Sequence, residues 1–355
     1  MNSVQRELGP NVKLHFDVID LLSDTELGKD AGNFGEFFLR FDAIVFEYGY
    51  RPVFSAVDGF LQIKNISKAK LISTLIARLR LAVINSADDI ESVRESLFSV
   101  LSDEHLALTI EAYCADVNRH IWSDRADLAV GALVQHLDWL RSQNVEVSSN
   151  MLIEAAFTCN RFEQHFLAAE FSYLAYNQAI ESGDDFAIDR ASFFVLNSNR
   201  LAGTGGRYLK EGYARQNLKL ETGRSSAFRF NQFLTPVFAA FTEFSESKPD
   251  LGEIDKLLGL AADIGHPDAA YCRKAWMIAR GLQYFHRGDV RAARESYEEL
   301  WCSTSREDRA IDKMAELLAR RLQLARVYQP QKAIVPASAE QWRLLSRHVE
   351  PNESA

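Results

Sequence analysis

The side chains that most often carry metal or nucleophilic chemistry, histidine and cysteine, are scattered along the 355 residues of this chain. The closest two of the eight histidines, His105 and His120, are 15 positions apart, and neither an HxxxH nor an HExxH pattern occurs. The common zinc motifs place two ligands on one helix or in one tight turn. We therefore predict no metal site, and we expect buried, reduced thiols at the four cysteines, which form no CxxC pair: Cys114, Cys159, Cys272 and Cys302.

Carboxylates and serines show no catalytic pattern either. Paired acids such as Asp88 with Asp89 and Glu298 with Glu299 are neighbours in sequence, which does not place them on two sides of a substrate. The GxSxG motif of a serine nucleophile is absent from the sequence. We expect a protein that is not an enzyme and that binds no cofactor. An active site assembled from residues distant in sequence is the open alternative.

A glycine-rich stretch, Gly203 to Gly206, precedes Arg207 and Lys210 and could cradle a phosphate group. A nucleotide-binding loop follows a buried strand and has its lysine next to serine or threonine, whereas here a helix is expected before the glycines. A turn between two helices, which uses the freedom of glycine at positive φ, is the favoured interpretation.

The most basic part of the chain runs from Arg200 to Arg229, with seven basic residues against two acidic ones. Tyrosine and phenylalanine are interleaved with the basic residues, so this stretch could hold an acidic peptide, a phosphate or a carboxylate. A solvated helix face that pairs with acidic neighbours is the alternative. An earlier basic stretch, Lys64 to Arg80, is followed by acidic residues from Asp88 to Glu95, an alternation that indicates complementary helix faces.

The overall composition excludes several classes of protein. Hydrophobic residues make up 47% of the chain and charged residues 25%, as in an ordinary globular protein. A formal net charge of -9 disfavours nucleic acid as a direct partner. The longest apolar stretches are interrupted by charge, and the first residues lack the basic start and apolar run of a secretory signal. We expect a cytoplasmic protein that does not insert into a membrane.

Apolar residues recur at helical spacing through most of the chain, and strand patterns are rare. Even the aromatic and β-branched stretch from Phe41 to Tyr50 has no partner hairpin, so we interpret it as a buried helix. Short loops with Gly, Asp, Asn or Ser separate the expected helices. These helices cover residues 71–86, 88–101, 103–120, 125–142, 150–161, 162–182, 185–201, 208–220, 226–244, 251–264, 268–286 and 289–301.

One stretch resembles a known repeat. Between Trp276 and Trp301, small, aromatic and turn residues alternate in a fixed order: Gly281, Tyr284, Gly288, Ala293 and Tyr297. This order is similar to that of the tetratricopeptide repeat, in which small residues let two helices approach and aromatic residues fill the gaps. The resemblance implies an all-α fold, a right-handed superhelix of stacked antiparallel helix pairs. It also implies a concave face that holds extended peptides or partner helices.

The match departs from the family in its spacing, because the dipeptide Asn-Arg recurs at positions 118, 160 and 199, nearer 40 than 34 residues apart. A small residue follows 13 or 14 positions after each arginine: Ala132, Ala175 and Ala214. The closing proline of the family is mostly missing, and the first hundred residues do not match. An irregular α-solenoid is therefore the expectation, with a shared register for its helix pairs.

We divide the chain into an N-terminal helical region (1–102), a tetratricopeptide-like array (103–328) and a tail with a short capping helix (329–355). The expected function is that of a non-catalytic scaffold or adaptor, which binds an acidic or extended peptide of another protein on its concave face. A regulatory protein that senses a peptide or small ligand is the alternative, and an enzyme is the second. The sequence does not predict an oligomeric state. The residues expected to bind the partner are Asn160, Asn197, Asn199, Arg200, Arg207, Lys210 and Arg215.

Overall fold

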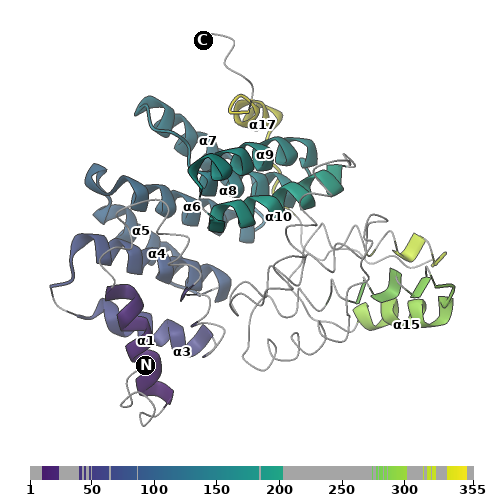
Figure 1. Cartoon of the computed structure of the whole chain (residues 1–355), viewed down its shortest axis with the longest axis horizontal. Coiled ribbons are helices and arrows are strands. Elements are labelled where there is room, and N and C mark those ends of the chain that lie inside the picture. Colours follow the sequence, from purple (N-terminus) through teal and green to yellow (C-terminus); the bar gives the residue numbers. More distant parts are fainter. Residues whose placement is uncertain are drawn as a thin grey trace.

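All the regular elements of this computed structural model are helices in the part of the chain that it describes (Figure 1). That part covers residues 10–23, 50–63, 65–85, 87–183, 185–202, 287–301 and 334–349, with single positions near residues 40–48, 274–285 and 315–324. One isolated parallel β-bridge, between Arg125 and Val335, accompanies them. The prediction of an all-helical protein is confirmed for these residues.

The helix bounds follow the apolar periodicity closely, although two helices near the N-terminus, α1 and α3, were not among the predicted ranges. Residues 103–105 form a short 3-10 turn rather than the start of a helix. The helices are α1 (Pro10–Ser23), α3 (Tyr50–Leu61), α4 (Lys68–Asn85), α5 (Ile90–Val100), α6 (Leu106–Trp122), α7 (Ala126–Ser142), α8 (Ser149–Arg161), α9 (His165–Ser182), α10 (Asp185–Ala202), α15 (Val290–Trp301) and α17 (Ala339–Ser346).

Short polar turns end these helices and reverse the chain. Gly183 ends α9 with φ of 67°, in the left-handed region that glycine enters without a steric penalty. Asp124 and Asn144 adopt similar positive φ angles after α6 and α7. Ser148 is the N-cap residue of α8, and its hydroxyl oxygen accepts a hydrogen bond from the backbone N–H of Met151 at 3.3 Å. The turns are tight enough to place successive helices side by side.

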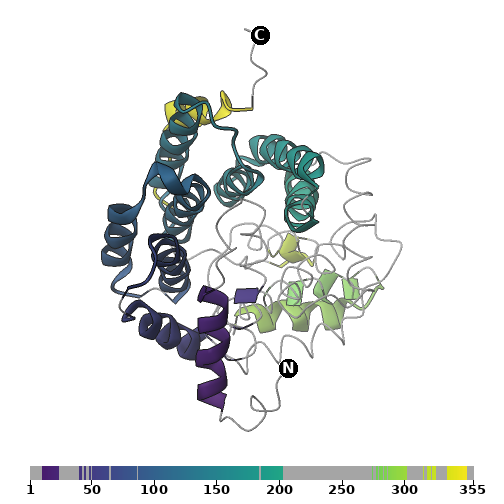
Figure 2. The same cartoon turned by 60° about the vertical axis from the view of Figure 1, so that its left-hand side comes forward.

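Four helices, α4, α6, α8 and α10, pack one after another and form what we call the central row. Between them in sequence, α5, α7 and α9 each pack against the row helix that precedes them, which makes a second layer. The view in Figure 2 shows the described helices from α1 to α10 following a curved path. The consecutive pairs α4–α5, α6–α7 and α8–α9 are therefore hairpins, and α9 also packs against α10.

The core is divided into two clusters that share α6. Leu108 and Ala112 of this helix join a cluster with α1, α3, α4 and α5, whereas Ile110 and Val117 join a cluster with α7, α8 and α9. Because α6 is apolar on both sides, it takes part in the cluster with α1, α3, α4 and α5 on one side and in the cluster with α7, α8 and α9 on the other.

The stretch that resembles a tetratricopeptide unit forms a helical hairpin. Helical positions from 274 to 285 are followed by a turn at Gly288, with φ of 81°, and then by α15. Asp289 begins α15, and its carboxylate accepts a hydrogen bond from the backbone N–H of Ala292. A Cβ at Gly281 would lie at an ordinary contact distance of 3.5 Å from the backbone oxygen of Ala293 on α15, whereas it would lie only 2.6 Å from a methyl of Leu318 in a later segment.

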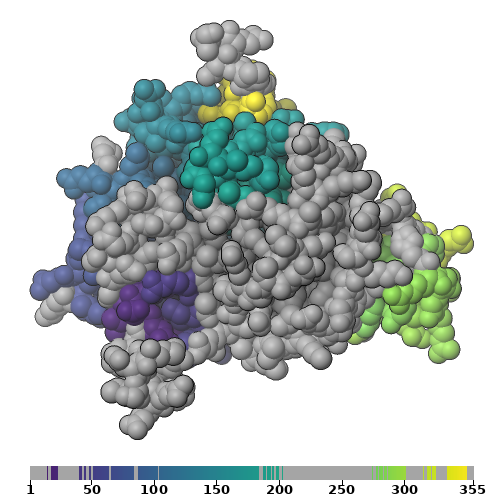
Figure 3. Space-filling view, in the orientation of Figure 1, coloured from purple at the N-terminus to yellow at the C-terminus, as the bar shows by residue number. Residues whose placement is uncertain are grey.

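The tail returns to the middle of the chain. Helix α17 packs against α7, and Figure 3 shows its yellow residues seated beside the teal helices at the upper edge of the molecule. The predicted short helix at 341–348 is thus present as α17, and its neighbour is α7. Within the described ranges, no helix is both long and apolar enough to cross a bilayer.

Candidate functional site

A line of polar side chains crosses the central row. It starts at Glu111 of α6, whose carboxylate accepts hydrogen bonds from Arg80 of α4 at 3.3 Å and from Asn150 of α8 at 2.8 Å. Burial raises the pKa of Glu111 above its ordinary value, although the Arg80 guanidinium and the Asn150 amide oppose this effect. One carboxylate therefore connects three consecutive helices of the row.

The same line continues to α10. Arg190 donates a hydrogen bond to the side-chain oxygen of Asn150 at 3.1 Å and lies 3.6 Å from the carboxylate of Glu154. Asn118 of α6 donates to the other oxygen of Glu154 at 2.8 Å. A buried polar group costs free energy unless it is hydrogen-bonded, so these bonds hold the row helices in one register. We call this line the polar row: Arg80, Glu111, Asn118, Asn150, Glu154 and Arg190.

Next to the polar row lies a second line, made of aromatic rings. The ring of Phe157 on α8 makes edge contacts with Trp122 on α6, at 5.6 Å between centroids, and with Phe194 on α10, at 6.0 Å. All three side chains are half-buried. Each of the row helices α6, α8 and α10 therefore contributes one ring. We call Trp122, Phe157 and Phe194 the aromatic row.

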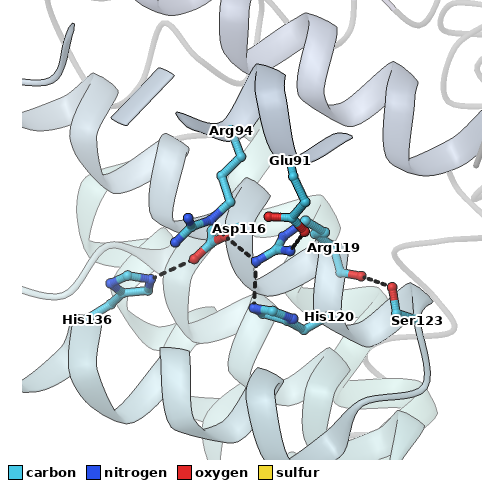
Figure 4. Close-up of polar contacts among 7 residues, drawn as sticks. All are labelled: Glu91, Arg94, Asp116, Arg119, His120, Ser123 and His136. Atoms are coloured by element: carbon cyan, nitrogen blue, oxygen red, sulfur yellow. Dashed lines mark hydrogen bonds and ion pairs between the residues drawn. The ribbon is translucent and has the colours of Figure 1, made fainter. Parts of the chain in front are cut away.

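A separate cluster of charged groups joins α5, α6 and α7 (Figure 4). Its centre is the buried Asp116, which accepts a hydrogen bond from Arg94 at 2.6 Å and another from Arg119 at 3.2 Å. Burial by itself would raise the pKa of Asp116, but hydrogen bonds from His136 and Arg94 outweigh it and hold this pKa well below its ordinary value. Arg119 also pairs with Glu91 at the start of α5.

Two histidines flank this cluster, His120 on α6 and His136 on α7. His136 lies 3.7 Å from Asp116, and its ring is stacked on Tyr113 with 4.0 Å between centroids. Burial and the neighbouring Arg119 lower the pKa of His120 to about 4, so His120 is neutral at pH 7. The buried carboxylate is fully engaged by cations, and the cluster therefore braces three helices.

The repeated Asn-Arg dipeptide has a structural explanation. In the first copy, Asn118 reaches forward to α8, while Arg119 reaches back to Glu91 at the start of α5. In the second copy, Asn160 donates to Ser198 of α10 at 2.8 Å, while Arg161 pairs with Asp124 in the α6–α7 turn at 2.7 Å. In these two copies, the dipeptide thus links its helix to the next helix of the central row and to the preceding hairpin. In the third copy, Asn199 donates within its own helix.

The residues predicted to bind a partner are only partly described. Asn160 is 5% exposed, and Asn199 donates a hydrogen bond to the backbone oxygen of Val195 within its own helix. Asn197 is half-buried on α10, and Arg200 belongs to the same helix. The structure brings Asn160, Asn197 and Asn199 onto the neighbouring helices α8 and α10. Three predicted residues lie outside the described residues: Arg207, Lys210 and Arg215.

The three residues of the aromatic row were not among the residues predicted to bind a partner, and all three pack against the core clusters. A signal for the row exists in the sequence, since aromatic residues recur at positions 122, 157 and 194, each near the end or middle of a row helix.

The expected pairing of the basic stretch with the acids after it is confirmed at one point. Arg78 lies 2.5 Å from Asp89, and also 2.5 Å from Asp58 of α3.

The described cysteines are buried thiols, as predicted. Cys114 and Cys159 are free and fully enclosed, and burial raises the pKa of both. The other two, Cys272 and Cys302, lie outside the described residues. In the part of the chain that the structure describes, no group of three or more His, Cys, Asp or Glu side chains could hold a metal ion.

Comparison with known proteins finds no relative from which a function could be transferred: no protein-family model, no curated protein and no solved structure matches the chain significantly.

Proposed function

We propose that this chain is a non-catalytic, cytoplasmic scaffold or adaptor that holds an acidic or extended peptide segment of another protein. In this proposal, the helix hairpins form a right-handed, tetratricopeptide-like α-solenoid, and the central row lines its concave side. The serial packing of α4, α6, α8 and α10 supports this architecture, because stacked hairpins that expose one helix each create a long continuous wall.

The observation that carries the proposal is the aromatic row. Half-buried rings from three consecutive helices of the central row form a strip beside Asn118 and Arg190, both themselves only partly buried. Aromatic and arginine side chains are enriched where proteins bind one another, since they contribute a large contact area together with directional bonding. A strip that follows the stacking direction suits an extended segment better than a compact small molecule.

The polar row supports the same function indirectly. It fixes the spacing of the row helices, and a fixed spacing keeps the aromatic rings in place before a partner arrives. The predicted residues Asn197 and Asn199 lie on α10, the last described helix of the central row.

The test is affinity capture with the full chain as bait, followed by mass spectrometry. Phe157→Ala should reduce recovery of a specific partner at least tenfold, because Phe157 is the central ring of the strip. Phe166→Ala is the matched control, since Phe166 is 69% exposed and lies on α9, outside the central row. Thermal melts of both variants must show that they remain folded. Equal recovery by the wild-type chain and a folded Phe157→Ala variant would refute the proposal.

The basic residues predicted to favour an acidic partner are tested in the same assay. The double variant Arg200→Ala with Arg207→Ala should weaken capture, and the loss should shrink at high salt because ionic contacts are screened. If the double variant binds as the wild-type chain does, the acidic character of the partner is wrong while the role of the aromatic row stands.

A further inference from the structure

The C-terminal segment from Ile334 to Val349 contacts α7 in the way that a short peptide ligand contacts its receptor. It first runs extended alongside the α6–α7 turn and then forms α17, which lies on α7. Extended addition to a backbone edge and a helix in a groove are two recurrent modes of peptide recognition, and this segment combines them.

The extended part supplies an acceptor that α7 needs. The N-cap residue of α7 is Arg125, which makes no side-chain capping hydrogen bond. Instead, the backbone N–H of Ala126 donates to the carbonyl of Val335 at 2.9 Å, and the N–H of Val335 donates to the carbonyl of Asp124 at 3.0 Å. Pro336 follows Val335 and favours an extended backbone at that residue. The tail therefore takes the place of a missing N-cap.

The helical part is anchored by one fully buried side chain. Leu345 is 0% exposed in the core cluster around α7 and α8, with Trp342 and Val349 packed partly against the same cluster. On α7, Gly131 leaves room for the side chain of Gln341, whose amide nitrogen would lie 3.5 Å from a Cβ at that position. The Gln341 amide donates to the backbone oxygen of Asp127 at 2.7 Å.

The segment also contains local hydrogen bonds that favour a helix. Ser338 and Gln341 form a reciprocal capping box, and Arg343 makes two hydrogen bonds to Glu340 one turn earlier. A last contact at the far end of α7 joins His348 to Asp138 at 3.3 Å. A segment that carries its own helix signals and a single deep anchor has the properties of a recognition motif.

We infer that the α6–α7 turn at Asp124 and the face of α7 as far as Asp138 form a docking site for a short linear segment. Residues 334–349 of the same chain occupy this site, and the site can also bind that segment from a separate molecule. The recognised pattern is an extended Val-Pro pair, a serine cap, and Gln341, Trp342 and Leu345 on one helix face. This inference is independent of the proposed function, because it concerns α7 and not the central row.

The test uses the full chain and a fluorescent synthetic peptide of residues 334–349. In a full-length Leu345→Asp variant the cis segment loses its anchor, so the peptide should bind, and fluorescence polarisation should rise to saturation. The wild-type chain should bind the peptide at least tenfold more weakly, because its own segment competes at a millimolar effective concentration. A peptide that carries Leu345→Asp is the matched negative control.

A second receptor variant locates the site. Gly131→Leu, added to the Leu345→Asp chain, should abolish peptide binding, since the larger side chain would fill the space used by Gln341. Circular dichroism and thermal melts follow each variant. Two results would overturn the inference: no peptide binding to a folded Leu345→Asp chain, or global loss of helix in that variant, which would make the segment an integral part of the core.

Discussion

At the scale of single residues, the molecule depends on a few buried charges that each connect several helices. Asp116 is the clearest of them, because two guanidinium groups and His136 converge on one carboxylate that is 3% exposed. Removing one partner of a buried ionic cluster leaves the others without compensation in a region of low dielectric constant. Such residues should dominate the response of stability to mutation and to pH.

Asp116→Asn should lower the free energy of unfolding by about 3 kcal/mol, because it leaves Arg94 and Arg119 facing a neutral amide. The folded-state pKa of Asp116 lies below its ordinary value, so its contribution is present above about pH 4 and is lost as the pH falls through the folded pKa. Urea unfolding at pH 7 and at pH 3 should therefore give a smaller difference between variant and wild type at the lower pH. Glu340→Gln, on an exposed pair with Arg343, should leave stability almost unchanged, because solvent screens this pair.

Glu111 should behave in the opposite way. Its folded-state pKa is raised above the ordinary pKa of a glutamate. The free energy of unfolding therefore falls as the pH rises from that ordinary pKa through the raised pKa. Glu111→Gln removes this ionisation but keeps an oxygen that can accept from Asn150. The stability of the variant relative to wild type should increase between pH 4 and pH 8 in urea unfolding. A difference that stays constant over this range would contradict the assignment.

At the scale of elements, two glycines in helices offer a matched pair. A Cβ at Gly59 of α3 would meet nothing within 4 Å, whereas a Cβ at Gly281 would lie 2.6 Å from the buried Leu318. Gly59→Ala should stabilise the chain by about 0.5–1 kcal/mol, through helix propensity alone. Gly281→Ala should destabilise it by about 1 kcal/mol, because overpacking exceeds the same gain. Thermal melts that moved in the same direction for both variants would refute the close approach at Gly281.

The position and length of most helices could be predicted from the sequence, since apolar periodicity and turn residues are local signals. In α4, Ile72, Ile76, Leu79 and Val83 recur at helical spacing, and all four are buried. The faces that meet could not be predicted in the same way. Phe157 packs against the core and stays half-buried beside Phe194, because the packing of α8 against α10, and not the local pattern, decides its exposure.

For the candidate site, the sequence predicted only that the helix hairpins share one alignment. The repeated Asn-Arg dipeptide indicated that the hairpins share one alignment, and the contacts of Asn118 and Asn160 with the next row helix give its physical basis. The roles within the polar row depend on side chains some 30 to 40 residues apart, such as Arg80 with Glu111 and Glu111 with Asn150. No local pattern specifies such pairs, so the polar row became visible only with the packed helices.

At the scale of the whole molecule, the pairing of Ala126 with Val335 bears on how the protein is made. Roughly two hundred residues separate these two positions. At ribosomal speeds of about 5–20 residues per second, α7 waits on the order of 10 to 40 s before its acceptor is synthesised. During that interval the backbone N–H of Ala126 lacks the Val335 acceptor and α17 does not yet cover α7, so the packing of α7 is completed only after the C-terminal segment has been synthesised.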